Sequence, residues 1–141
     1  MDQTIKTLQL LKQMRNRSVS ELTGQLSQQK QLCQRYQNNI DALTSLNEGS
    51  QIQSGDTAAL MHNQSHYKTH LRHLINWQQQ EFAMADKQAQ TLQTNLVKEA
   101  CREKTVELVL EDQQAEIATE QERQQQKIAD AMSTQCWLRG R

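Results

Sequence analysis

Four histidines in the middle of the chain have the spacing that most resembles a chemical site. His62, His66 and His70 follow one another at steps of four, and His73 comes three residues later. On a helix this spacing places the first three imidazoles along one face, where two of them could share a zinc ion. The neighbouring side chains are mostly Gln, Asn and Lys, whereas metal ligands usually have carboxylates around them. We therefore expect a solvated or partner-facing flank, and we predict no metal site and no cofactor.

Other reactive side chains also lack a catalytic arrangement. Cys33, Cys101 and Cys136 occur at no metal-binding spacing, and no basic residue is placed to activate one of these thiols. Carboxylates such as Glu99 and Glu107 alternate with Lys and Arg, which is typical of a solvated helix face. No glycine-rich phosphate loop occurs. We predict that the protein has no catalytic residues and is not an enzyme.

Composition favours an extended helical protein over a globular one. The 141 residues have a formal net charge of zero, 35% hydrophobic residues, 4% aromatic residues and a mean hydropathy of −0.88. A thick core is not expected from these values, and no basic field indicates nucleic acid or a membrane surface. The chain shows no signal-peptide core and no apolar run that could span a bilayer, so reduced thiols in the cytoplasm are expected.

The stretch from Thr57 to Ser133 contains neither Pro nor Gly and predicts one very long helix. At 1.5 Å per residue it would run roughly 110–120 Å, so it needs a partner helix. A stripe at steps of four and three is expected to face that partner, with two successive four-residue steps at Ala85 and Ala89 that predict a coiled-coil stutter. Its members are Leu60, Gln64, Tyr67, Leu71, Leu74, Gln78, Glu81, Ala85, Ala89, Leu92, Leu96, Glu99, Glu103, Val106, Leu110, Gln113 and Ile117.

A second stripe predicts a first helix over about 4–46, and the two helices are predicted to form one antiparallel coiled-coil hairpin over 1–141. The first stripe comprises Val19, Leu22, Leu26, Gln29, Cys33, Tyr36, Ile40 and Leu43. The tip is expected at about 47–57, with Gly49 following the first helix, and the second helix at about 58–135. Ser54, Asp56 or Thr57 could cap that second helix.

The two predicted arms are unequal in length. Folding at about 50–54 would place Ile5 near Leu96 to Glu99 and leave the chain beyond about Ala100 without a partner helix. An uncovered apolar stripe there would be an interaction surface for another protein or a second copy. With the N-terminal apolar residues it forms one candidate interaction surface: Ile5, Leu8, Leu11, Val106, Leu110 and Ile117.

The two-helix pattern, its Gln-rich composition and the position of the tip resemble the FliJ family over nearly the whole chain. That resemblance implies a cytoplasmic, non-enzymatic component of flagellar type III protein export, similar in fold to the stalk (γ) subunit of rotary ATPases. It implies entry into and activation of the ring of the export ATPase (FliI-like), and the candidate surface from Ile5 to Ile117 is where we expect that ring to bind. It also implies contact with the export gate protein FlhA and escort of export chaperones. It also implies peripheral association with the inner-membrane gate and a part in motility.

The family's gate-contact spacing falls on four residues of each helix. These are Gln29, Cys33, Tyr36, Ile40, Tyr67, Leu71, Leu74 and Gln78. The same eight residues could instead be simply the seam between the helices. Two alternative functions also stay open: the equivalent stalk protein of a virulence type III secretion system, and a homo-oligomeric coiled-coil scaffold.

Overall fold

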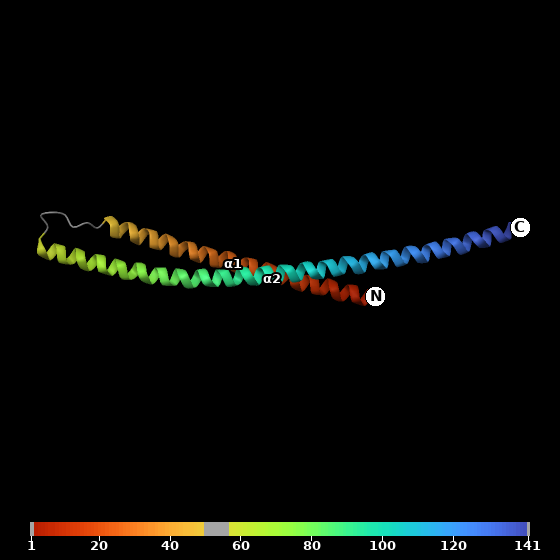
Figure 1. Cartoon of the computed structure of the whole chain (residues 1–141), viewed down its shortest axis with the longest axis horizontal. Helices are drawn as coiled ribbons and strands as arrows, with labels where there is room; N and C mark the ends of the chain where they lie inside the picture. The colour runs from red at the N-terminus through yellow and green to blue at the C-terminus, as the bar shows by residue number, and fades with distance from the viewer. Residues whose placement is uncertain (1, 50–56, 141) are drawn as a thin grey trace. The chain divides into compact units, whose positions relative to one another are not determined.

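The computed structural model describes residues 2–49 and 57–140. Two helices account for nearly all of them (Figure 1): α1 spans Asp2–Gly49 and α2 spans Ala58–Arg139. Neither described range contains a strand. The predicted all-α hairpin of two unequal helices is therefore confirmed, and each helix is longer than the sequence indicated.

The start of α2 is capped by Thr57. Its hydroxyl accepts a hydrogen bond from the Leu60 N–H at 3.2 Å, and its carbonyl accepts one from the Met61 N–H at 2.9 Å. The other two predicted caps, Ser54 and Asp56, and most of the predicted tip lie outside the described residues. Gly49 is the last residue of α1, whereas we expected it to follow the helix.

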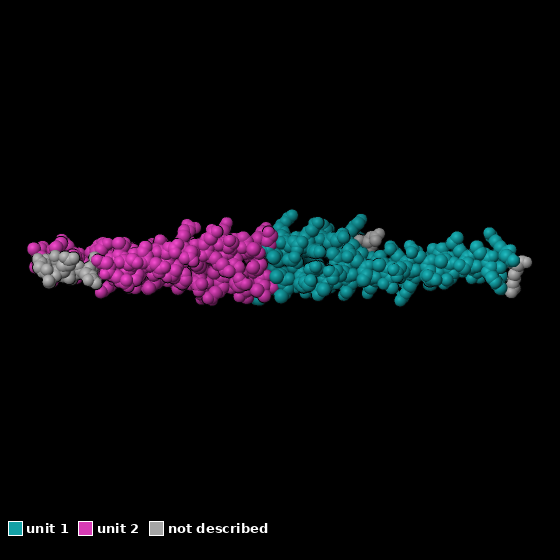
Figure 2. All heavy atoms as spheres, turned by 90° about the horizontal axis from the view of Figure 1, so that it is seen from above, with its two compact units in different colours: residues 1–19, 98–141 teal, residues 20–97 magenta. Residues whose placement is uncertain are grey.

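The chain forms two compact units, each built from part of both helices (Figure 2). One unit is residues 20–97, and the other combines residues 1–19 with 98–141. Within 20–97 the helices are antiparallel: the Gln29 side chain reaches the backbone carbonyl of Ala85, and Asn39 reaches Gln78. The same direction holds in the second unit, where Arg15 meets Glu99.

The seam of the 20–97 unit is thin and partly polar. Its most buried side chains are Leu26, Ile40, Leu71, Gln78, Ala85 and Ala89, with relative exposures of 4–8%. Small Ala residues on α2 leave room for a long side chain of α1, and Gln29 uses it to donate to the Ala85 carbonyl at 2.9 Å. The predicted α1 stripe is confirmed here, because Leu22, Leu26, Gln29, Cys33, Tyr36, Ile40 and Leu43 are all buried or half-buried.

The seam of α2 in this unit differs from the predicted stripe at alternate positions. Leu60, Tyr67 and Leu74 are exposed (45%, 46% and 45%), while Lys68 and Ile75 are half-buried. The buried and half-buried positions include an unbroken series of four- and three-residue steps: Gln64, Lys68, Leu71, Ile75, Gln78, Phe82, Ala85, Ala89, Leu92 and Leu96. The predicted stutter was therefore wrong. Tyr67 is more apolar than its half-buried neighbour Lys68, and Leu74 and Ile75 are both apolar, so hydrophobicity did not identify the residue that faces α1.

The unit formed by 1–19 and 98–141 corrects the prediction that the chain beyond Ala100 is uncovered. Arg15, rather than Ile5, lies level with Glu99, so the pairing is displaced by ten residues along α1. Ile5 then comes level with about residue 110, where Leu110 is only 6% exposed. The half-buried positions of α2 continue to Ile117, and every residue from 118 to 140 is exposed.

Candidate interaction surfaces

Most of the predicted gate-contact residues lie in the seam between the helices. Ile40, Leu71 and Gln78 are buried, and Gln29, Cys33 and Tyr36 are half-buried. Polar members have partners there: the Gln29 amide also donates to Gln88 at 3.1 Å, and the Gln78 carbonyl oxygen accepts from Asn39 at 3.3 Å. These six side chains hold the hairpin together, as the alternative interpretation of the pattern predicted.

Tyr67 and Leu74 are the two members of that set that are exposed. Two further large side chains on α2, Trp77 and Met84, are 54% and 61% exposed. Leu74 and Trp77 are three residues apart, so they are neighbours on the helix surface, and Met84 lies two turns beyond Trp77. The sequence reasoning missed Trp77 and Met84 because neither belongs to the predicted stripe. In the structure the seam passes through Leu71, Ile75 and Gln78, and Trp77 and Met84 lie outside it.

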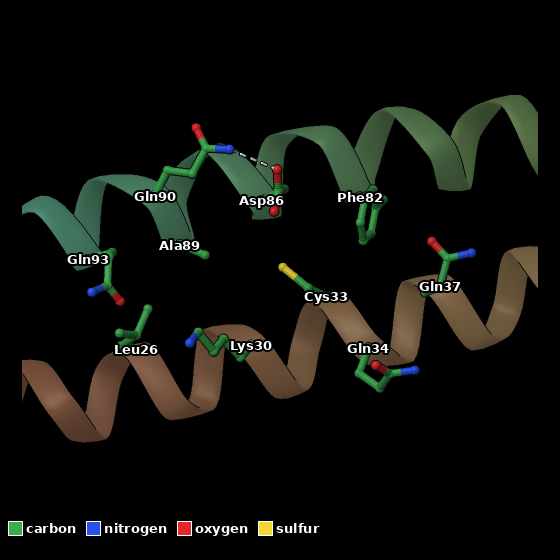
Figure 3. A pocket seen from close by; sticks show the side chains of 10 residues that line it. All are labelled: Leu26, Lys30, Cys33, Gln34, Gln37, Phe82, Asp86, Ala89, Gln90 and Gln93. Carbon is green, nitrogen blue, oxygen red and sulfur yellow. Dashed lines mark hydrogen bonds between the residues drawn. The ribbon is translucent and has the colours of Figure 1, made fainter.

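An open groove of about 550 Å³ runs along the hairpin beside Cys33 (Figure 3). Leu26, Phe82 and Ala89 line it with several glutamines and with Asp86, whose carboxylate accepts a hydrogen bond from Gln90 at 3.1 Å. Burial raises the pKa of the Cys33 thiol, the negative charge of Asp86 raises it further, and a backbone hydrogen bond partly offsets both. The thiolate is the nucleophilic form of cysteine, so a raised pKa makes the Cys33 thiol less reactive near neutral pH.

In the other unit, Glu99 forms ion pairs with two arginines, one on α1 and one on its own helix α2. It lies 3.2 Å from the Arg15 guanidinium of α1 and 2.8 Å from Arg102 one turn further along α2. The Glu99 side chain is only 14% exposed. The hydrogen bond from Arg102, followed by the bond and charge of Arg15, lowers the pKa of Glu99 despite its partial desolvation. This site joins the helices and has no free reactive group.

The predicted ring-binding residues occupy the covered part of this same unit. Leu110 is buried, and the others are half-buried: Ile5, Leu8, Leu11, Val106 and Ile117. The reason for choosing them, an uncovered stripe, was therefore wrong, although their role in binding stays a prediction. The uncovered apolar side chains lie further along α2. Ile128, Met132 and Leu138 are 60%, 62% and 56% exposed on a segment that α1 does not cover.

All four histidines are exposed on α2. The imidazoles of His62 and His66 meet edge to face, with ring centroids 4.5 Å apart. Across the described residues, three or more His, Cys, Asp or Glu side chains nowhere gather closely enough to hold a metal ion. Within the same described ranges, no helical stretch combines the length and apolar character that crossing a bilayer requires.

Comparison with known families identifies this helical hairpin. The family model described as "Flagellar FliJ protein" matches residues 4–141. The chain belongs to the FliJ family. Comparisons with curated proteins and with solved structures gave no match. Membership in this family, whose members are non-catalytic, makes the chain a component of flagellar type III protein export. It also favours the flagellar over the virulence alternative.

Proposed function

We propose that this FliJ-family chain is a non-enzymatic, stalk-like activator of the flagellar export ATPase. It inserts into the ATPase ring, contacts the export gate protein FlhA at the inner membrane and escorts export chaperones. The observation that carries the proposal is the last part of α2, where residues 118–139 extend past the helix pairing and expose Ile128, Met132 and Leu138. Ile128 and Met132 lie one turn apart on one face of the helix, and covering exposed apolar side chains with a partner is favourable.

The ring contact is assigned to this uncovered segment. Binding here would bias the ring subunits toward an assembled, active conformation, while the ATPase itself performs the hydrolysis. Ile5, Leu8, Leu11, Val106, Leu110 and Ile117 would act indirectly, by packing α1 against α2 at the base of the segment. In this arrangement α2 is held by α1 up to Ile117, and the exposed residues that follow are free to contact the ring.

A charge substitution on the apolar face tests the ring contact. Changing Ile128 and Met132 together to Glu places two charges on that face, and Glu is a good helix former, so the helix should persist. We expect the stimulation of ATP hydrolysis by the cognate export ATPase to be lost. The control changes Gln126 and Ser133 to Glu, which adds the same charge away from that face. Equal stimulation by both variants would contradict the assignment.

Gate contact is assigned to the exposed residues Tyr67 and Leu74, extended by Trp77. Large aromatic side chains are frequent energetic anchors of interfaces, and Trp77 is the most exposed of the three. Changing Leu74 and Trp77 to Ala should weaken binding to the cytoplasmic part of FlhA while the thermal stability of the chain stays nearly the same. Changing the buried Leu71 to Ala should instead lower stability. Unchanged FlhA binding by the Leu74/Trp77 variant would contradict this assignment.

The homo-oligomeric scaffold is the second candidate, because the exposed segment 118–139 could equally be covered by a second copy. Light scattering separates the two functions. The stalk role predicts a mass near the 16.3 kDa of one chain at low micromolar concentration. An obligate dimer whose mass does not change on dilution would favour the scaffold.

A further inference from the structure

The first turns of α2 carry a histidine pair that the proposed export function does not use. From Thr57 to Tyr67 every described residue is exposed except Gln64, which is half-buried. His62 and His66 lie one turn apart, and their ring centroids are 4.5 Å from each other. Both rings can therefore approach the same point beside the helix.

The chemistry of the pair favours a transition metal over a hard cation. Two His side chains at i and i+4 on one helix face are the ligand pair used in helical zinc sites. Imidazole nitrogen suits zinc, copper and nickel, whereas calcium and magnesium need oxygen ligands. Residues 58–80 contain four histidines and no Asp or Glu, so the segment offers imidazole but no carboxylate.

We propose that His62 and His66 form a two-ligand site for a divalent transition-metal ion of the zinc class, with water in the remaining positions. The bridge joins two successive turns near the beginning of α2, where the side chains of residues 57–63 are exposed. A ligand that binds only the folded helix stabilises it, and the stabilisation grows with the logarithm of the ligand concentration once this exceeds the dissociation constant. The ion would thus stiffen this end of the hairpin reversibly, independently of the ATPase.

The test uses the full chain without an affinity tag, titrated with zinc and, separately, with nickel by calorimetry. We expect one saturable equivalent, and a rise in the thermal unfolding midpoint when metal is added. His62→Gln and His66→Gln should each abolish both effects. His73→Gln, a matched exposed histidine of the same segment, should leave both unchanged, and so should His70→Gln.

Three results would overturn the proposal. One is the absence of saturable binding, and another is binding that persists unchanged in the His66→Gln chain. The third is loss of binding in His70→Gln with retention in His62→Gln, which would assign the metal to a different pair. A variant with Cys33, Cys101 and Cys136 changed to Ser must still bind one equivalent of metal. Loss of metal binding in that variant would assign the metal to the thiols. Circular dichroism of each variant without metal verifies that the helix is retained.

Discussion

At the scale of single residues, the two most informative side chains are charged or reactive groups placed against the partner helix. Glu99 is paired with one arginine on each helix, and Cys33 lies beside Asp86 in a groove. The pKa of Glu99 is lowered first by Arg102 on the same helix and then by Arg15 on α1, whereas that of Cys33 is raised by burial and by Asp86 on α2. Substitution of Glu99 and the reaction rate of the Cys33 thiol therefore each test how these side chains are packed.

Glu99→Gln should lower the thermal unfolding midpoint at neutral pH and have less effect in acid. The pKa of Glu99 is lowered from its ordinary 4.5 in the folded chain, so the ionised form favours folding. Its contribution is present above pH 4.5 and is lost as the pH falls through the lower, folded-state pKa. The substitution also leaves Arg15 without its carboxylate partner, and Arg15 already has a buried Nε that lacks a hydrogen bond.

The measurement for Glu99 is circular dichroism melting at pH 7 and at pH 3. Glu111→Gln is the matched control, because Glu111 is exposed. A loss of stability from Glu99→Gln that is equally large at both pH values would contradict the account, since it would show that the charge of Glu99 does not stabilise the fold.

The three thiols should react at different rates. Cys101 and Cys136 are exposed, whereas Cys33 is half-buried and its pKa is raised by burial and by Asp86. Because the thiolate is the reactive species, a disulfide reagent near neutral pH should modify two thiols quickly and one slowly. Cys33→Ser should remove the slow phase only. A single fast phase for all three thiols would show that the groove opens freely.

At the scale of the helices, the seam of α2 decides which apolar residues stabilise the hairpin. Leu71 is 5% exposed, and Leu74 is 45% exposed although it is only three residues away. Leu71→Ala should cost about 2–5 kcal/mol, the usual range for a leucine truncated in a core. Leu74→Ala should cost well under about 1 kcal/mol. Urea unfolding of both variants measures the difference. Equal losses of unfolding free energy would indicate that Leu74 is buried as the sequence predicted, against the observed seam.

Gly24 tests the intrinsic cost of glycine in α1. An added Cβ at this position would meet no heavy atom within 4 Å, so the residue is not required for close packing. Gly24→Ala should therefore stabilise the chain by roughly 0.5–1 kcal/mol. Thermal unfolding should show a midpoint a few degrees higher. A lower midpoint would mean that another chain or helix needs the space at Gly24.

The sequence predicted the existence and order of both helices because their composition and periodicity agree over many turns. Thr57 was among the predicted caps, and the buried Leu26 and Ile40 were in the predicted α1 stripe. The α2 stripe failed between residues 60 and 75 because the seam there is partly polar. Lys68 contributes a half-buried position, while the more apolar Tyr67 beside it faces solvent. In such a seam, apolar character alone does not identify the buried face.

At the scale of the whole molecule, the sequence did not determine how far the arms slide along each other. The register is marked by side-chain contacts such as Arg15 with Glu99 and Gln29 with Ala85, and these pairs were not evident from the sequence. In the observed register the uncovered surface begins beyond Ile117, whereas it was expected beyond Ala100. The proposed ring contact moved to segment 118–139 for this reason. The family assignment does not depend on how the two helices are aligned.

Shortened chains therefore separate folding from binding. A chain ending at Ile117 keeps every buried and half-buried position of α2, so its unfolding midpoint should be close to that of the full chain. A chain ending at Ala100 lacks Leu110 and the other residues that cover the beginning of α1, so it should be less stable. Circular dichroism melting of both chains measures this. Similar destabilisation by the two truncations would contradict the observed pairing.

The most direct test of the central claim is ATP hydrolysis by the cognate export ATPase, with the full chain and the chain ending at Ile117 titrated in parallel. The proposal predicts stimulation by the full chain and little or none by the shortened chain, although both are folded. Equal stimulation by the two chains would show that segment 118–139 does not make the ring contact. No stimulation by either chain would contradict the activator role itself.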